Sequence, residues 1–381
     1  MHVWYADGPD APLSNPFTAC AAAGIDADRA DVTLGWMTEQ PTWLDDTRLE
    51  IGTVLAGYAL AKPVNAGTVT DNEARLSAVP SLIAEARPDL ALVTGVRRGD
   101  VLAFGSSVGW GDVLARTAGR VVVEIDDHGV DLGGPEIEGN IVTTIQRPVG
   151  AASAGSATSR PADDIDRTIG AHVASLVPDG ASLQFGPGGI GEGICASLTR
   201  PVAIWSGLVT EAMAQLADRD LLAKPVVAAY AWGGDAIRRL AATGMLELVS
   251  STETHDISLI SSIPNFVGCN TGLQVDLTGA VNVSRVGSRT IAAVGGHADF
   301  CAGASRSVGG ISVIALRSTT SRGSSTIVAR VDVVSTSGID VDVIVTEHGV
   351  ADLRGVDHRE RARRIAHVAA PEYREELSHQ P

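Results

Sequence analysis

Positive charge is scarce in this chain of 381 residues. It has 29 lysine and arginine residues against 45 aspartate and glutamate residues, a formal net charge of −16. Nucleic-acid binding depends mainly on neutralising phosphates, and anionic membrane surfaces attract basic clusters. This acidity therefore argues against nucleic acid and membrane surfaces as partners. Binding of an anionic small ligand remains possible if backbone N–H groups or a few local arginine or lysine residues compensate its charge.

The chain also lacks long apolar runs and cysteine patterns. No stretch reaches the roughly 18–20 apolar residues that a membrane span needs. The first residues show neither the basic nor the apolar segment of a secretory signal. The four cysteines are scattered without Cys-x-x-Cys spacing, which argues against a zinc knuckle or a disulfide framework. We therefore expect a cytoplasmic protein with no structural metal.

What is present is typical of an α/β protein with two domains. Short β-branched apolar runs bounded by Gly, Asp or Pro, such as 90–94 and 120–125, are typical of buried parallel strands. Residues 108–117 between them predict a crossover helix. A small, polar stretch without periodicity at 151–161 is typical of a linker. We predict an N-terminal α/β domain at 1–150, a linker at 151–163 and a C-terminal α/β domain at 164–381.

The second block alternates helices and strands. Helices are predicted at 165–176 and from the glycine loop to about 198. Strands are predicted at 181–185, 201–205, 225–230, 311–316 and 341–345.

A glycine loop joins the first strand of this block to its helix. Gly186-x-Gly188-x-x-Gly191 matches the dinucleotide pattern, and it lies between a strand and a helix as that motif requires. A dinucleotide site also needs an acid at the end of the next strand to hold the ribose. That strand ends at 205–207 as Trp-Ser-Gly, so we do not expect NAD. A purely structural loop remains an alternative.

The segment 346–355 reads Thr-Glu-His-Gly-Val-Ala-Asp-Leu-Arg-Gly and precedes an arginine-rich helix at 357–366. It resembles the closing motif of the acetyl-CoA hydrolase/transferase family. Three further segments match in the same order, at 179–190, 270–279 and 295–300. The resemblance is strong over 165–377 and loose before that. It implies the class I CoA-transferase fold, with two open, mostly parallel-sheet α/β domains and a thioester site between them.

The resemblance also implies catalytic roles for particular residues. Glu347 would be the acid/base carboxylate, and Asn270 would orient the acyl or acid group. Gly295 and Gly296 would donate N–H groups to the thioester oxygen, an oxyanion-hole role. His297, beside this pair, could act as a general base near neutral pH; an ordinary loop histidine is the alternative.

Coenzyme A is the implied ligand, as an acyl-CoA substrate, with no metal. The glycine loop would let it approach bare backbone N–H groups at Gly186, Gly188, Gly189 and Ile190.

The family works through a glutamate that attacks the acyl-CoA and then carries the CoA as a thioester. An ungapped match puts Gly207 at that position, and glycine has no side chain to attack with. A gapped match would bring Glu211 there instead. Other departures are Gln274, where the family has an acid, and Ala302, where it has arginine. Neighbouring Cys301 would be a nucleophile only if it faced the cleft with a lowered pKa.

We therefore expect an enzyme that processes acyl-CoA by hydrolysis, of a thioester or of a carbon–carbon bond in a β-keto acyl-CoA. An ordinary CoA transferase and a catalytically degenerate CoA-binding subunit are the alternatives. We expect a homo-oligomer, or a hetero-oligomer with an active paralogue.

Overall fold

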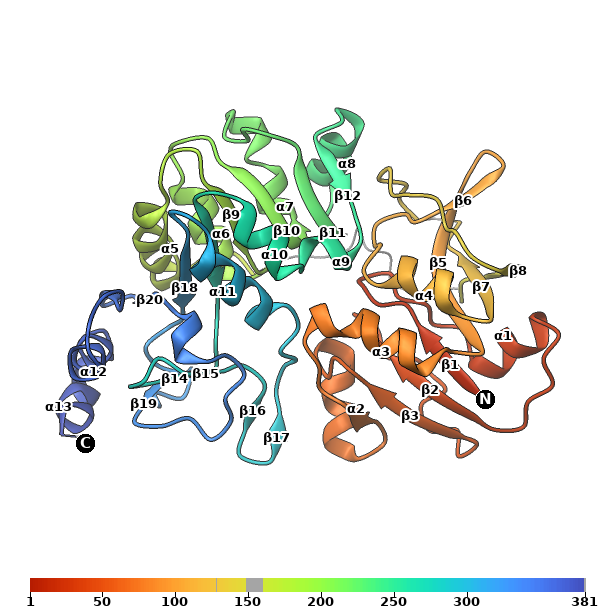
Figure 1. Cartoon of the computed structure of the whole chain (residues 1–381), viewed down its shortest axis with the longest axis horizontal. Helices are drawn as coiled ribbons and strands as arrows, with labels where there is room; N and C mark the ends of the chain where they lie inside the picture. The colour runs from red at the N-terminus through yellow and green to blue at the C-terminus, as the bar shows by residue number, and fades with distance from the viewer. Residues whose placement is uncertain (128, 149–159, 380–381) are drawn as a thin grey trace.

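The computed structural model describes residues 1–127, 129–148 and 160–379. They form two lobes, each built on its own sheet (Figure 1). Among these residues, β8 (Ile141–Gln146) is the last strand of the first lobe and α5 (Asp164–Leu176) is the first helix of the second. Both sheets are mostly parallel and carry helices, which confirms the predicted α/β class. The predicted linker lies largely outside the described residues, so the boundaries at 150 and 164 stay a prediction.

The first lobe has a sheet in the order β4-β3-β2-β1-β5-β7-β8, with every neighbouring pair parallel. Strand β6 pairs antiparallel with β5. The strands of the first lobe are β1 (His2–Tyr5), β2 (Ala30–Leu34), β3 (Leu49–Thr53), β4 (Thr70–Asp71), β5 (Leu90–Arg98), β6 (Val101–Ala103), β7 (Arg120–Ile125) and β8 (Ile141–Gln146). Its helices are α1 (Pro16–Ala22), α2 (Ala61–Ala66), α3 (Val79–Ala86) and α4 (Gly111–Thr117).

The second lobe has a sheet in the order β12-β11-β10-β9-β13-β18-β20-β21, parallel except for the β20–β21 hairpin. Its strands are β9 (Ser182–Phe185), β10 (Ala203–Thr210), β11 (Val226–Trp232), β12 (Leu246–Leu248), β13 (Phe266–Asn270), β18 (Ile311–Ala315), β20 (Val343–Thr346) and β21 (Gly349–Asp352). Smaller sheets use β14 (Gln274–Asp276), β15 (Val281–Asn282), β16 (Arg285–Val286), β17 (Arg289–Thr290) and β19 (Ile327–Val328).

Helices of the second lobe lie on both faces of its sheet, and α12 and α13 lie at the outer end beside the β20–β21 edge (Figure 1). The helices of this lobe are α5 (Asp164–Leu176), α6 (Gly189–Ser197), α7 (Glu211–Ala214), α8 (Asp235–Ala242), α9 (Ser251–Thr254), α10 (Ile257–Ser262), α11 (His297–Arg306), α12 (His358–His367) and α13 (Arg374–Ser378). No helix among the described residues is both long and apolar enough to cross a membrane.

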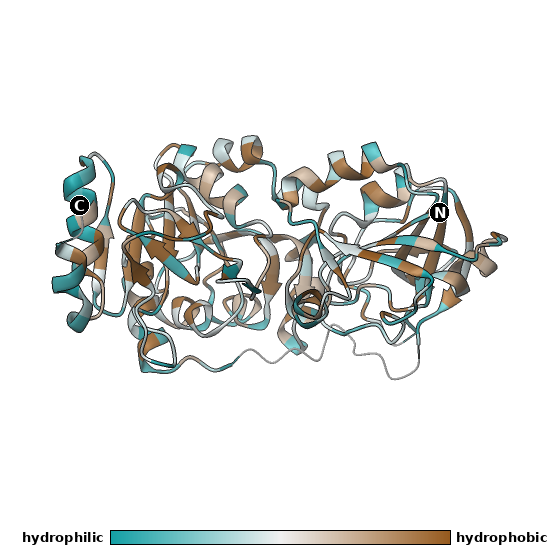
Figure 2. Cartoon of the chain, turned by 90° about the horizontal axis from the view of Figure 1, so that it is seen from below, coloured by the Kyte–Doolittle hydropathy of each residue, from teal (hydrophilic) through white to brown (hydrophobic). Residues whose placement is uncertain are grey.

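The buried strands explain why these elements form. Hydrophobic residues, coloured brown in Figure 2, concentrate along these strands, and most of them are buried, as expected for sheets covered on both faces. One predicted strand is longer than expected. Strand β10 continues to Thr210 because Trp205 to Thr210 pair with β11, so Gly207 lies inside the strand and not at its end.

The order of the second sheet reverses between β9 and β13. The chain leads from β9 outward through β10, β11 and β12, then returns to β13 on the other side. In open α/β sheets, ligands bind beyond the carboxyl ends of the strands at such a switch point. The glycine loop follows β9, and Asn270 ends β13, so both lie there.

Backbone hydrogen bonds join the two lobes. The loop before α4 pairs with β11: Val108 N donates to Ala229 O at 2.9 Å, and Ala231 N donates to Ser106 O at 2.8 Å. Beside them, the hydroxyl of Tyr230 donates to Oδ2 of the buried Asp7 at 2.6 Å.

Asp7 makes the stability of this junction sensitive to pH. Burial raises the pKa of Asp7 from 3.8 to about 7, although hydrogen bonds from Tyr230 and the Trp110 backbone oppose the rise. A raised folded-state pKa gives stability that is fully present below about pH 3.8 and lost as the pH rises to about 7. We expect wild type to lose on the order of 4 kcal/mol over this window relative to Asp7→Asn, which stays neutral.

Urea unfolding of both proteins at pH 4.5 and pH 7.5 measures this difference. The free energy of unfolding of Asp7→Asn, relative to that of wild type, should be higher at pH 7.5 than at pH 4.5. If the two free energies of unfolding change in parallel, Asp7 does not titrate in this window.

Candidate functional site

The predicted site residues lie along one edge of the second sheet. The glycine loop follows β9, with Ile190 half-buried in the first turn of α6. Asn270 ends β13, and Glu347 follows β20 in the hairpin turn. The pair Gly295–Gly296 leads directly into α11.

The glycines of the loop after β9 serve two different purposes. A Cβ on Gly189 would overlap the carboxylate of Asp166, and one on Gly191 would come within 2.6 Å of the Gly186 carbonyl oxygen. Packing therefore accounts for both. A Cβ on Gly186 or Gly188 would meet nothing within 4 Å. Gly188 has φ +121°, which favours glycine. These two positions are the open backbone that a ligand could approach.

Asn270 and His297 come together around a buried thiol. The Asn270 Nδ2 atom lies 3.7 Å from Cys301 Sγ, and His297 Nδ1 lies 3.7 Å from the same sulfur. His297 Nδ1 also lies 2.8 Å from the hydroxyl of Thr336. Gln184 on β9 donates to Asn270 Oδ1 at 3.3 Å, which links the group to the switch point.

Burial controls the chemistry of this group. It raises the pKa of Cys301 to about 12, and that residue has no exposed surface, so its thiol is inert at neutral pH. Burial also lowers the pKa of His297 to about 4, well below the value near neutral that the sequence suggested. His297 is therefore neutral at pH 7. Its Nε2 is buried without a hydrogen-bond partner among the described residues.

The first lobe fixes the glycine pair in front of α11. Leu76 N donates to Gly295 O at 3.1 Å. The carboxylate of Asp299 accepts the Ser77 hydroxyl at 2.6 Å and the Ser77 N–H at 3.1 Å. Asp299 thus has a structural role, and the thioester candidate site borders both lobes.

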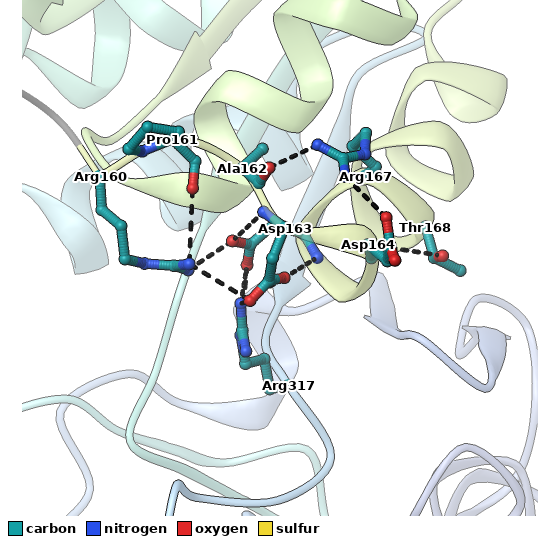
Figure 3. Close-up of polar contacts among 9 residues, drawn as sticks. Arg160, Pro161, Ala162, Asp163, Asp164, Arg167, Thr168 and Arg317 are labelled. Carbon is teal, nitrogen blue, oxygen red and sulfur yellow. Dashed lines mark hydrogen bonds and ion pairs between the residues drawn. The ribbon is translucent and has the colours of Figure 1, made fainter.

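Glu347 is held by a neighbouring loop. Its carboxylate accepts two hydrogen bonds from Ser318, one from the backbone at 2.9 Å and one from the hydroxyl at 2.7 Å. The preceding Arg317 reaches the start of α5, where its Nη2 lies 2.7 Å from both oxygens of Asp163 and from Oδ1 of Asp166 (Figure 3). Arg317 holds the pKa of Asp163 well below its usual range. These ion pairs of Arg317 therefore hold the loop that positions Glu347 against the start of α5.

The predicted residues thus form two groups. Asn270 and Glu347 follow strands that are separated by β18, a spacing of roughly 10 Å in a sheet. Among the described residues, the hydrogen bonds of Glu347 go to Ser318 and not to the group around α11.

One residue that the sequence did not single out lies against Gly207. A Cβ on Gly207 would come within 2.9 Å of both Cε1 and Nε2 of His255. His255 follows α9 as its C-cap residue and is 2% exposed. Its ring packs at a tilt against Phe300, with 4.8 Å between the ring centroids. The sequence signal was indirect: a glycine inside a buried strand leaves space that another side chain must fill.

Glu211 is occupied elsewhere. Its Oε2 accepts from Gly234 N at 2.7 Å and its Oε1 accepts from Ala236 N at 2.9 Å. These are backbone donors at the start of α8, which are otherwise unpaired within a helix. Glu211 therefore caps α8.

No group of three or more His, Cys, Asp or Glu side chains in the described part of the chain could hold a metal ion. An open hollow of about 650 Å³ lies on the first lobe, lined by residues such as Asp26, Arg87 and Arg120. All of its lining residues belong to the first lobe, and none of them is a predicted site residue.

Comparison with known proteins gives independent evidence on the family. Residues 237–381 match the model of the acetyl-CoA hydrolase/transferase C-terminal domain. The chain is 33% identical over 229 residues to a 4-hydroxybutyrate coenzyme A transferase of Clostridium kluyveri, covering 56% of this chain and 53% of that protein. It is 28% identical over 246 residues to an acetyl-CoA hydrolase of Eremothecium gossypii, covering 56% of this chain and 45% of that protein.

The fold has a solved counterpart. The crystal structure of a 4-hydroxybutyrate CoA-transferase from Porphyromonas gingivalis superposes with a TM-score of 0.75 at 23% identity, covering 99% of this chain and 91% of that one. The sequence matches span about half the length of the two curated relatives. Residues 237–381 thus carry an acetyl-CoA hydrolase/transferase C-terminal domain, and the rest of the chain resembles proteins of that family in sequence and fold.

Proposed function

We propose that this protein is an enzyme that hydrolyses acyl-CoA thioesters, with water in place of an enzyme glutamate as the nucleophile. The observation that carries the proposal is that neither of the two positions matched to the family's glutamate offers a free carboxylate. Gly207 has no side chain, and both oxygens of Glu211 are bonded to the start of α8. Without a free carboxylate at either position, the covalent route by way of a glutamyl thioester would lack its nucleophile.

The other predicted residues have roles that fit hydrolysis. CoA would lie along the open backbone at Gly186 and Gly188. The carbonyl oxygen of the thioester would accept from N–H groups at Gly295 and Gly296, where donors stabilise the charge that develops on oxygen. Asn270 would orient the acyl group, and Glu347 would move a proton during release of the products.

Transfer of CoA to a carboxylic acid is the second candidate, because relatives such as the Clostridium kluyveri protein are named CoA transferases. A non-catalytic CoA-binding subunit is the third. We further propose that the protein assembles with copies of itself or with an active paralogue, and that it lies in the cytoplasm.

Steady-state turnover on a panel of acyl-CoAs, with and without acetate or succinate, separates these functions. Hydrolysis predicts release of CoA at a rate that the acid does not change. A rate that depends on the acid would show a transferase, and no turnover at all would favour the binding subunit. With acetoacetyl-CoA, acetoacetate and CoA indicate thioester hydrolysis, whereas acetate and acetyl-CoA indicate carbon–carbon cleavage.

Coenzyme A is expected to stabilise the fold, and NAD is not. A ligand of the native state alone adds RT ln(1 + [L]/Kd), about 2.7 kcal/mol at a hundredfold excess over Kd. A thermal-shift series with CoA, acetyl-CoA and NAD measures it.

Two matched variants locate the binding. Gly188→Ala and Gly180→Ala both strain a glycine with positive φ, at +121° and +71°, where a Cβ would meet nothing within 4 Å. Both should lose some stability, but only Gly188→Ala should lose the shift with CoA. A shift with NAD alone, or equal CoA shifts in both variants, would contradict the assignment.

A further inference from the structure

Two glycines from separate elements face one imidazole ring. A Cβ on Gly207 in β10 would lie 2.9 Å from Cε1 and Nε2 of His255. A Cβ on Gly296, just before α11, would overlap Cδ2 and Nε2 of the same ring. Nε2 is the atom common to both contacts. The ring therefore occupies the space into which a side chain at position 207 would project, and it borders the glycine pair.

Its surroundings hold the ring in one orientation. Nδ1 lies 2.8 Å from the hydroxyl of Thr254, which leaves Nε2 turned toward the two glycines. Phe300 of α11 packs against the ring at 4.8 Å. On the other side, Ser251 N donates to Gly109 O of the first lobe at 2.7 Å, which anchors α9 at the junction.

The ring is neutral. Burial lowers the pKa of His255 to about 4, and no charged group contributes to that shift. With a proton on Nδ1, a neutral imidazole presents a lone pair at Nε2, which can accept a proton. At the position of the missing carboxylate, His255 thus offers a base but no oxygen that could form a glutamyl thioester.

We propose that His255 replaces the family's glutamate, and that its Nε2 is the general base that activates the hydrolytic water. The proposal rests on the hydrolytic function proposed above and gives it a residue. Glu347, whose carboxylate is bonded to Ser318, then handles protons elsewhere in the cycle.

The step balances without any further reactant. Nε2 takes a proton from water while the water oxygen bonds to the thioester carbonyl carbon, and the π electron pair moves to the carbonyl oxygen near Gly295 and Gly296. When that pair returns, the carbon–sulfur bond breaks. The departing sulfur takes the proton back from Nε2. Acyl-CoA and water become a carboxylic acid and CoA, and His255 ends neutral as it began.

Removing the ring tests the proposal. His255→Ala is expected to lower kcat for the best acyl-CoA of the panel by about 10²–10⁴-fold, the usual contribution of a general base. The stabilisation by CoA should remain. Ile260→Val is the packing control, because Ile260 is buried against Gly303 of α11 and the change leaves the imidazole and Phe300 in place; it should lower thermal stability and keep kcat within about threefold.

Chemical rescue separates a base from a space-filling ring. Added imidazole should raise the activity of His255→Ala at least tenfold over its activity without imidazole. Pyrazole, a ring of the same size and a much weaker base, should not. If His255→Ala does not fold, Thr254→Val gives the second test, because it keeps the imidazole and removes the hydroxyl beside Nδ1; kcat should fall by about five- to tenfold with unchanged CoA binding.

The outcomes distinguish this proposal from the function on which it rests. Hydrolysis by wild type that persists in His255→Ala, equal rescue by pyrazole and imidazole, or full kcat in Thr254→Val would overturn the role of His255 alone. No hydrolysis by wild type on any acyl-CoA would overturn the proposed function and the role of His255 with it.

Discussion

Changing Glu347 to glutamine is expected to lower kcat for thioester hydrolysis by about 10²–10⁴-fold, the range that a general acid–base group contributes. Glutamine has the same shape, and its amide oxygen can still accept from Ser318, whose two hydrogen bonds hold the side chain. The loop should therefore keep its structure while the proton-transfer capacity is lost. Stopped-flow or steady-state release of CoA measures the loss, with thermal unfolding as the check on the fold.

Glu360→Gln is the matched control for this variant. Glu360 lies in α12, close to Glu347 in sequence, and pairs with Arg363 and Arg364 on the helix surface. The same change of charge there should leave kcat unaltered. If Glu347→Gln has the activity of wild type, the bonds to Ser318 are structural and the carboxylate does not move a proton in the reaction.

Gly207→Glu is expected to lower the free energy of unfolding by more than about 3 kcal/mol. Its Cβ would lie 2.9 Å from two atoms of the His255 ring, in a strand where Gly207 is buried. The change therefore overpacks the core and also buries a carboxylate without a partner, and each effect costs a few kcal/mol. Urea unfolding compares it with wild type.

The double variant Gly207→Glu/His255→Gly tests whether the two positions share one space. Removing the ring should return part of the lost stability, so the two effects should be clearly non-additive, as expected for residues in contact. Intact-mass analysis after incubation with acyl-CoA would then show whether the introduced carboxylate can carry CoA. If Gly207→Glu is as stable as wild type, the contact with His255 does not constrain this position.

Much of the fold followed from local patterns. The strands β5 and β7 and the helix α5 were predicted close to their observed bounds, because short continuous β-branched runs and helical periodicity are strong local signals. The sequence did not predict where β10 ends, because its last residues are held in the strand by pairing with β11 and not by their intrinsic β-propensity.

The candidate site was only partly predictable for a similar reason. Gly188 and Glu347 lie in motifs that follow predicted strands, so the sequence placed them on one edge of the sheet. Asn270 came from the family resemblance alone, because no strand was predicted before it; the structure adds β13 there. The contact of His255 with Gly207 and Gly296 joins three elements that are distant in the chain, and a glycine gives no hint of which side chain will fill the space beside it. Packing around an absent side chain is visible only in three dimensions.

A single turnover in water enriched in oxygen-18 tests the central claim most directly. If water attacks the thioester carbonyl, the acid released in the first turnover carries one solvent oxygen, and no glutamate of the protein gains label. On the covalent route, the first acid takes its oxygen from an enzyme carboxylate and is unlabelled, and that glutamate gains oxygen-18 when its thioester is hydrolysed. We expect labelled acid and unlabelled protein by mass spectrometry. Unlabelled acid together with oxygen-18 in a peptide that contains Glu211 would contradict the account.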